Sequence, residues 1–218
     1  MSRTPPLYAL ARHTIGRYLH HSWRPTVTGL HHLPDAGGAI LAANHLSVAD
    51  QLFLGVLTPR HIAFWAKAEY FRAPGPRGFL TRRVVTGMGA IPVERGGGRA
   101  ALTAFDAAVP VLRSGGLVAV FPEGTRSPDG RLYRGRTGAV RLAHQAGVPI
   151  IPVGIRGTDR VRPPGSRLPR RHPISITFGP AIPVLIETPA DIRRHTETLM
   201  AAIQSLTRQE YVQHYARP

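Results

Sequence analysis

The sequence has 218 residues, 43% of them hydrophobic, which is enough for one globular domain with a buried core. It contains no cysteine, which excludes disulfide scaffolds, cysteine-ligated zinc, iron–sulfur clusters and thiolate nucleophiles. The net charge of +16 implies an anionic partner, and since nucleic-acid-binding signatures are absent, an acidic membrane surface or a phosphorylated substrate is expected and no nucleic acid.

The first segment, from Leu7 to His21, has apolar residues near helical spacing and basic residues largely elsewhere. We interpret it as a basic amphipathic helix in a lipid headgroup region, although a helix packed on the domain fits the periodicity equally well. No stretch approaches the roughly 18 apolar residues of a transmembrane helix, and no cleavable signal is present. We therefore expect residues 1–24 to form this helix and residues 25–218 the main domain. The protein is expected to be cytoplasmic and peripheral on the inner face of the cell membrane.

Beyond this helix, short apolar runs alternate with longer helical patterns, which is typical of an α/β domain. The expected strands are Thr26–Leu30, Ala39–Ala43, Ile62–Ala66, Ala90–Val93, Leu117–Phe121, Ile150–Ile155 and Ile174–Phe178. The expected helices are Ala49–Leu57, Arg77–Thr86, Arg99–Arg113, Thr137–Gln145 and Asp191–Tyr211. In such domains functional groups gather where strands end and helices begin.

The polar segment Asn44 to Asp50 directly follows the expected strand that ends at Ala43. Residues five apart on a continuous helix are turned by about 140°, so His45 and Asp50 can meet only if His45 precedes the helix. Asp50 would then fix the tautomer of His45 and stabilise its imidazolium during general-base catalysis. Alternatively, Asp50 belongs to a capping box and accepts from a backbone N–H. Because no Gly-x-Ser-x-Gly elbow is present, His45 is expected to activate an acceptor hydroxyl directly.

Three further segments also lie at or beside apolar strands. Phe121 to Ser127 combines a glycine, two hydroxyls and Arg126, which suits a phosphate; an ion pair within a polar turn is the alternative. The segment Gly89 to Arg95 is a short strand that delivers Arg95 to a glycine-rich loop. The fourth segment, Val148 to Gly154, is apolar and is expected to form a wall of the core.

Taken in order, the four segments resemble the signature blocks of the lysophosphatidic acid acyltransferase family of glycerolipid acyltransferases, over residues 25–180. The resemblance implies a single-domain α/β glycerolipid acyltransferase fold, with a mixed central sheet flanked by helices. It implies transfer of a fatty acyl group from acyl-CoA or acyl carrier protein to the sn-2 hydroxyl of 1-acylglycerol 3-phosphate, which makes phosphatidic acid in phospholipid biosynthesis. No metal, no cofactor and no covalent intermediate are implied.

The resemblance also implies roles for individual residues. His45 would be the general base and Asp50 its partner. Lys67 would stabilise the oxyanion or only pair with Glu69, and Asn44 and Ser47 would support the site. A basic segment, 133–138, also fits the family and suits CoA phosphates or lipid headgroups. The acceptor's phosphate and glycerol would be held by Arg95, Glu123, Gly124, Thr125 and Arg126.

Two alternatives remain open. A sibling acyltransferase acting on another lysolipid, an ornithine lipid, glycerol 3-phosphate or a glycolipid would carry the same catalytic pair, although Arg95 and Arg126 favour a phosphate-bearing acceptor. A more remote alternative is a basic nucleic-acid-binding protein that has lost catalysis. Many family members carry an N-terminal transmembrane helix, whereas this sequence has only the amphipathic segment, so we expect peripheral attachment to an anionic membrane surface.

Overall fold

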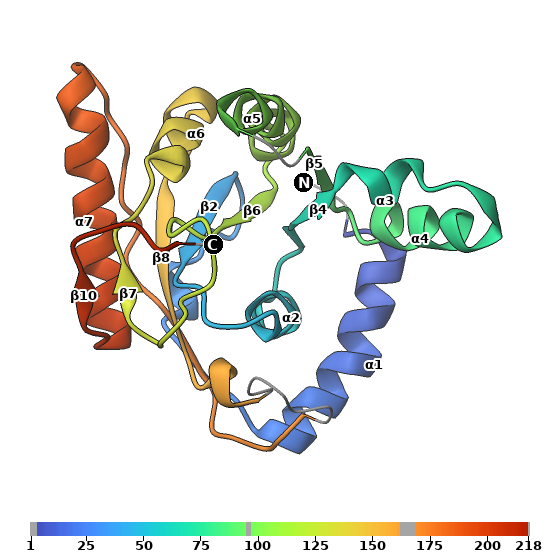
Figure 1. The fold of residues 1–218 in the computed structure, drawn as a ribbon. Helices are drawn as coiled ribbons and strands as arrows, with labels where there is room; N and C mark the ends of the chain where they lie inside the picture. The colour runs from blue at the N-terminus through green and yellow to red at the C-terminus, as the bar shows by residue number, and fades with distance from the viewer. Residues whose placement is uncertain (1–3, 95–96, 162–168, 218) are drawn as a thin grey trace.

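The central sheet of the protein has six strands. The computed structural model describes residues 4–94, 97–161 and 169–217, without the side chains of 97–103. The strands are Thr26–Thr28 (β1), Ala39–Ala43 (β2), Ile62–Ala63 (β3), Leu117–Val120 (β6), Ile150–Arg156 (β8) and Ser175–Phe178 (β9). Their order is β1-β9-β8-β2-β6-β3, and all neighbours are parallel except β8 and β9 (Figure 1). The expected mixed α/β sheet is confirmed.

Helices cover both faces of the sheet, because its central strands are apolar on both sides. In β2, Leu41 belongs to one core cluster, whereas Ile40 belongs to the other. The first face is covered by α1 (Pro6–Trp23) and α2 (Ala49–Leu57). The second face is covered by α5 (Gly97–Arg113), α6 (Gly138–Ala146) and α7 (Pro189–Thr207). This double burial explains why the parallel strands are continuous apolar runs in the sequence.

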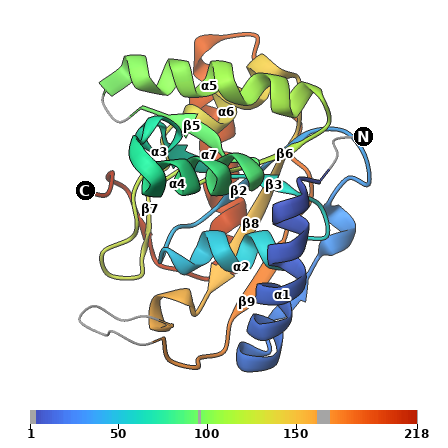
Figure 2. The same ribbon diagram turned by 90° about the vertical axis from the view of Figure 1, so that its right-hand side faces the viewer.

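A smaller unit lies beside the main sheet. It consists of β4 (Trp65–Lys67) paired in parallel with β5 (Ile91–Val93), and of α3 (Ala68–Arg72) and α4 (Gly75–Gly87) between them. The indole Nε1 of Trp65 donates to the carbonyl oxygen of Ala119 in β6 over 2.8 Å, which ties the unit to the sheet. Helices α3 and α4 project from the body in Figure 1, and in Figure 2 they face the viewer together with α1 and α2.

Two expected elements are corrected by the structure. The expected strand Ile62–Ala66 is divided between two sheets, because β3 pairs with β6 whereas β4 pairs with β5. The expected helix Asp191–Tyr211 ends at Thr207, because Arg208 adopts the left-handed conformation with φ of 56°. Elements that the sequence did not predict are the strands β7 (Leu132–Tyr133) and β10 (Tyr211–Val212), which pair with each other, α3, and two short 3₁₀ helices at Leu30–His32 and Thr158–Arg160.

The N-terminal helix α1 combines the two interpretations of its sequence. One side packs on the domain and buries Tyr8, Gly16, Leu19 and Trp23. Large apolar side chains on other sides stay exposed, namely Leu10, Ile15 and Tyr18. The helix is therefore both a structural element of the domain and amphipathic toward solvent. In the described part of the chain, no helix combines the length and the apolar character needed to cross a membrane.

Candidate active site

The candidate catalytic residues lie in two loops that meet at one edge of the sheet. Because β2 and β6 are adjacent and parallel, the loops that follow them start side by side. The backbone N–H of His45, after β2, donates to Oε1 of Glu123, after β6, over 2.9 Å. The backbone N–H of Ser127 donates to the carbonyl oxygen of His45 over 2.7 Å. The loop after β6 therefore holds the backbone of His45 from both sides.

The structure brings His45 and Asp50 together, with Nδ1 of His45 at 2.8 Å from Oδ2 of Asp50. The same oxygen accepts from the backbone N–H groups of Leu46, over 2.6 Å, and Ser47, over 2.8 Å. The two functions considered for Asp50 thus occur together, because one carboxylate oxygen caps the turn before α2 and also holds the imidazole. The other oxygen, Oδ1, is buried and has no hydrogen-bond partner among the described residues.

This arrangement determines the tautomer of His45. An ionised carboxylate only accepts hydrogen bonds, so Nδ1 carries the hydrogen and Nε2 keeps its lone pair. The imidazole stacks on Phe121, with ring centroids 4.0 Å apart and an interplanar angle of 17°, which limits its rotation. The His45 side chain is 14% exposed, whereas that of Asp50 is completely buried. A substrate can therefore reach the base but not its partner.

Glu123 lies behind His45 and not on the exposed surface of the site. Its side chain is fully buried, and its second oxygen, Oε2, accepts from the backbone N–H of Tyr133 over 2.9 Å. Burial raises the pKa of Glu123 to about 7, although the N–H donors of Tyr133 and His45 oppose this shift. The direct contact between Glu123 and the acceptor, implied by the resemblance, does not fit this complete burial. The carboxylate instead joins the His45 loop to β7.

Asn44 and Ser47 are placed as supports of the turn. The amide Nδ2 of Asn44 donates to the carbonyl oxygen of Ile155, and Oδ1 accepts from the N–H of the same residue, both over 2.8 Å. The buried side chain thus continues the pairing of β2 with β8 beyond the last residue of β2. Oγ of Ser47 accepts from the N–H of Ala49 over 3.3 Å, at the start of α2.

The loop from Gly124 to Arg126 forms the rim of the candidate site beside His45 and Asp50. Gly124 has φ of 77°, and a Cβ at this position would lie 2.8 Å from Nε of Arg136. Thr125 is half-buried and Arg126 is exposed, so both are accessible to a substrate. Arg95 lies outside the described residues, and its proposed role stays a prediction.

Lys67 is the last residue of β4 and precedes α3. Its ammonium nitrogen lies 5.9 Å from the ring centroid of Tyr70. Among the contacts of the described residues, none joins Lys67 to His45 or to Glu69. A role in stabilising an oxyanion therefore stays a prediction.

The sequence did not predict that the C-terminal segment reaches the basic segment 133–138. The guanidinium carbons of Arg134 and Arg136 lie 5.6 and 5.0 Å from the ring centroid of Tyr215. The two arginines belong to the basic segment 133–138, but Tyr215 comes close only because β10 pairs with β7. Such a contact between distant parts of the chain leaves no local signal in the sequence.

Comparison with known proteins gives consistent relatives. Residues 24–156 match the Acyltransferase family. The chloroplastic 1-acyl-sn-glycerol-3-phosphate acyltransferase of Arabidopsis thaliana is 30% identical over 145 residues, which make up 66% of this chain and 39% of that protein. The 1-acyl-sn-glycerol-3-phosphate acyltransferase of Bacillus subtilis is 32% identical over 127 residues, 57% of this chain and 59% of that protein. The chain thus spans 39% and 59% of the length of these two relatives.

The fold also matches a solved structure. The crystal structure of the 1-acyl-sn-glycerophosphate acyltransferase from Thermotoga maritima superposes with a TM-score of 0.65, at 24% sequence identity. The match covers 91% of this chain and 82% of that chain, so the two share a fold. The family match extends over more than half of the chain and includes both loops that hold His45, Asp50 and Glu123. The chain therefore belongs to the Acyltransferase family.

Proposed function

We propose that this protein transfers a fatty acyl group from acyl-CoA or acyl carrier protein to the free hydroxyl of a lysophospholipid. The acceptor that we propose is 1-acylglycerol 3-phosphate, and the product is phosphatidic acid. The observation that carries this proposal is the pair formed by His45 and a buried Asp50 beside the accessible Arg126, in a chain of this family. The names of the curated relatives support the same acceptor.

The geometry supports a direct transfer in which His45 is the general base. Nε2 of His45 accepts the proton of the acceptor hydroxyl as that oxygen forms a bond to the thioester carbonyl carbon. Asp50 stabilises the imidazolium, which is charged only after this proton transfer. The carbon–sulfur bond then breaks, and the imidazolium returns its proton to the departing sulfur. The products are an ester and a free thiol, and His45 is neutral again.

Arginines beside the pair suit the phosphate of the acceptor. A guanidinium presents paired donors that match phosphate oxygens, and Arg126 is exposed on the rim. Arg136 lies next to Gly124 on the same rim, and the missing Cβ of Gly124 leaves room for its side chain. We assign acceptor binding to Gly124, Thr125, Arg126 and, from the sequence alone, Arg95. Glu123 is assigned to positioning His45.

An apolar cavity beside α2 is a candidate site for the acyl chain. It has a volume of about 230 Å³ and lies between α1, α2 and the unit formed by β4 and β5. Ile15, Leu52 and Phe64 contribute apolar walls. Leu52 lines this cavity from α2, the helix whose first turn carries Asp50.

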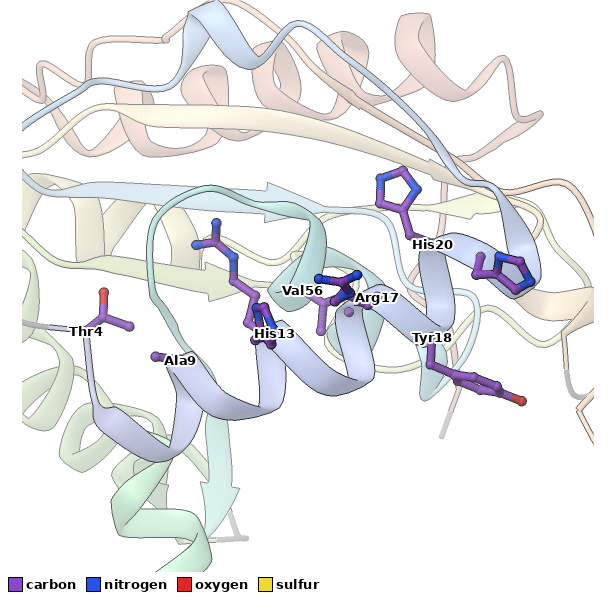
Figure 3. Close-up of a pocket in the computed structure, with 10 residues that line it drawn as sticks. Thr4, Ala9, His13, Arg17, Tyr18, His20 and Val56 are labelled. Atoms are coloured by element: carbon purple, nitrogen blue, oxygen red, sulfur yellow. The ribbon is translucent and has the colours of Figure 1, made fainter.

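We also propose that α1 attaches the protein to an anionic membrane surface on the cytoplasmic side. A hollow of about 960 Å³ runs along one side of α1 (Figure 3). Basic side chains line it, namely Arg12, His13, Arg17, His20 and His21. Such residues attract acidic headgroups, and the exposed Ile15 and Tyr18 supply apolar surface for the interface.

The proposed activity is tested by following thiol release from acyl-CoA with a panel of lysolipids and identifying the product by mass spectrometry. His45→Ala should reduce turnover at least about 100-fold, which is the usual contribution of a positioned general base. The matched control is His144→Ala, which removes an exposed histidine from the last turn of α6 and should leave turnover unchanged. Wild-type turnover in a folded His45→Ala protein would exclude this mechanism.

The same panel separates the alternatives. Preference for an ornithine lipid or a glycolipid over 1-acylglycerol 3-phosphate would make the protein a sibling acyltransferase with another acceptor. No thiol release with any acceptor, together with duplex binding at physiological salt, would favour the nucleic-acid-binding alternative.

A further inference from the structure

Exposed apolar side chains are concentrated on one face of the protein. Twelve large hydrophobic side chains are exposed among the described residues. Eight of them belong to α1, α2, α3 and α4, and a ninth, Val48, directly precedes α2. Figure 2 shows these helices facing the viewer together. Single exposed apolar residues are normal, but their concentration on one face indicates an interaction surface.

Helix α4 contributes three of these nine side chains, including the most exposed of them. Phe79 is 56% exposed, Leu80 65% and Val84 44%. The opposite side of α4 packs closely against the preceding backbone, since a Cβ on the buried Gly78 would lie 2.2 Å from the carbonyl oxygen of Ala73. Leu80 and Val84 are four residues apart, so they share one side of the helix, away from Gly78. The apolar side of α4 is therefore directed outward by the packing of the helix.

The charges around these side chains favour one kind of partner. Helix α4 carries Arg77, Arg82 and Arg83, and no acidic residue. The guanidinium carbons of Arg82 and Arg83 lie 6.0 and 5.9 Å from the ring centroid of Phe79. An apolar surface flanked by cations complements the interface of an anionic bilayer, where phosphates lie above the acyl chains. A second copy of this chain would bring the same positive charges together, which is unfavourable.

We propose that α4 is a second membrane-contact element, which inserts Phe79, Leu80 and Val84 into the interface of an anionic bilayer. It extends the attachment proposed above for α1 and rests on that part of the proposed function. With α1 and α4 both in contact, the bilayer covers the face shown in Figure 2. The wall of the apolar cavity formed by Ile15 and Leu52 then lies on the lipid side, so a lysolipid enters from the membrane and not from water.

The insertion is tested with the full chain, in which the absence of cysteine allows single-site labelling. Leu80→Cys is labelled with an environment-sensitive fluorophore and mixed with vesicles that contain phosphatidylglycerol and lipid-borne quenchers. The matched control is Leu185→Cys, since Leu185 is 74% exposed but lies between β9 and α7. We expect quenching of the label at position 80 and not at 185. An unquenched label at position 80 on vesicle-bound protein would overturn the proposal.

A binding measurement provides the second test. The double variant Phe79→Ser, Leu80→Ser should lower partitioning to these vesicles roughly 10-fold or more, whereas Leu185→Ser should not. Turnover of a soluble short-chain acceptor should be unchanged in both variants. Unchanged partitioning, or a change only in oligomeric state, would overturn the role of α4. If the Phe79→Ser, Leu80→Ser variant partitions to vesicles like the unchanged protein and still transfers acyl groups to 1-acylglycerol 3-phosphate, the inference on α4 fails and the proposed function stands.

Discussion

Replacement of Asp50 by asparagine tests the geometry of the catalytic pair. Oδ2 of Asp50 accepts from two backbone N–H groups, at Leu46 and Ser47, and faces Nδ1 of His45. In Asp50→Asn the two backbone donors require an oxygen at this position, so the amide nitrogen must occupy the site of Oδ1. That site has no hydrogen-bond partner in the described structure. The tautomer of His45 is therefore retained, and only the negative charge is lost.

The magnitude follows from this retained geometry. A hydrogen bond to a charged group contributes about 1.5–3 kcal/mol, and here it matters most when His45 is an imidazolium. We expect kcat to fall roughly 10- to 150-fold, with the KM values of both substrates near their original values. Asp50→Ala should in addition destabilise the fold by about 2–6 kcal/mol, because two backbone donors lose their acceptor. Asp50→Asn should destabilise it less.

Steady-state kinetics and urea unfolding measure these two effects separately. The matched control is Asp106→Asn, which makes the same chemical change at an exposed position of α5 and should change neither quantity. Wild-type kcat in the Asp50→Asn protein would refute the role assigned to the carboxylate. Equal destabilisation by alanine and asparagine would refute the proposed orientation of the amide.

Three further predictions follow from neighbouring residues. Arg126→Ala should lower kcat/KM for 1-acylglycerol 3-phosphate roughly 10- to 150-fold, but have little effect on an acceptor without phosphate; equal losses on both would contradict phosphate binding. Asn44→Ala should destabilise the fold by about 2–4 kcal/mol in urea unfolding, because the N–H and C=O of Ile155 are left without partners; a change below about 0.5 kcal/mol would contradict this. Because the pKa of Glu123 rises from 4.5 to about 7 on folding, the folded protein binds the extra proton between these values, and its stability falls as the pH rises through them. In the Glu123→Gln variant, the free energy of unfolding should therefore fall by up to about 3 kcal/mol less than in the unchanged protein between about pH 5 and about pH 8. An unchanged dependence of the unfolding free energy on pH would show that another group causes the fall.

The sequence predicted the parts of the site that are local. The turn from Asn44 to Asp50 could be predicted because it follows an apolar strand directly and its two polar groups are only five residues apart. The function of Glu123 could not be predicted, because its burial depends on β7, a two-residue strand with no pattern of its own. Which side of α4 faces outward could not be predicted either, because the burial of Leu80 depends on how α4 packs against α3.

The fold showed the same division between local and distant effects. The core strands β2, β6 and β8 were predicted because they are apolar along their whole length. The split of Ile62–Ala66 depends on two different pairing partners, and the end of α7 depends on the backbone conformation of Arg208. Neither feature is visible in a hydrophobic pattern. Residues 62–66 form one continuous apolar run, and Tyr211 and Val212 continue the apolar residues of α7.

The short pairing of β10 with β7 has a consequence for the smallest active unit. Residues that match the family end at 156, and β10 lies at Tyr211–Val212. Yet β10 pairs with β7, the N–H of Tyr133 in β7 binds Glu123, and Glu123 holds the backbone of His45. A fragment cut after residue 208 would keep the catalytic pair and both loops, but it would lose the strand that braces them. The two residues of β10, far from the signature segments, therefore support the loops that hold the candidate catalytic pair.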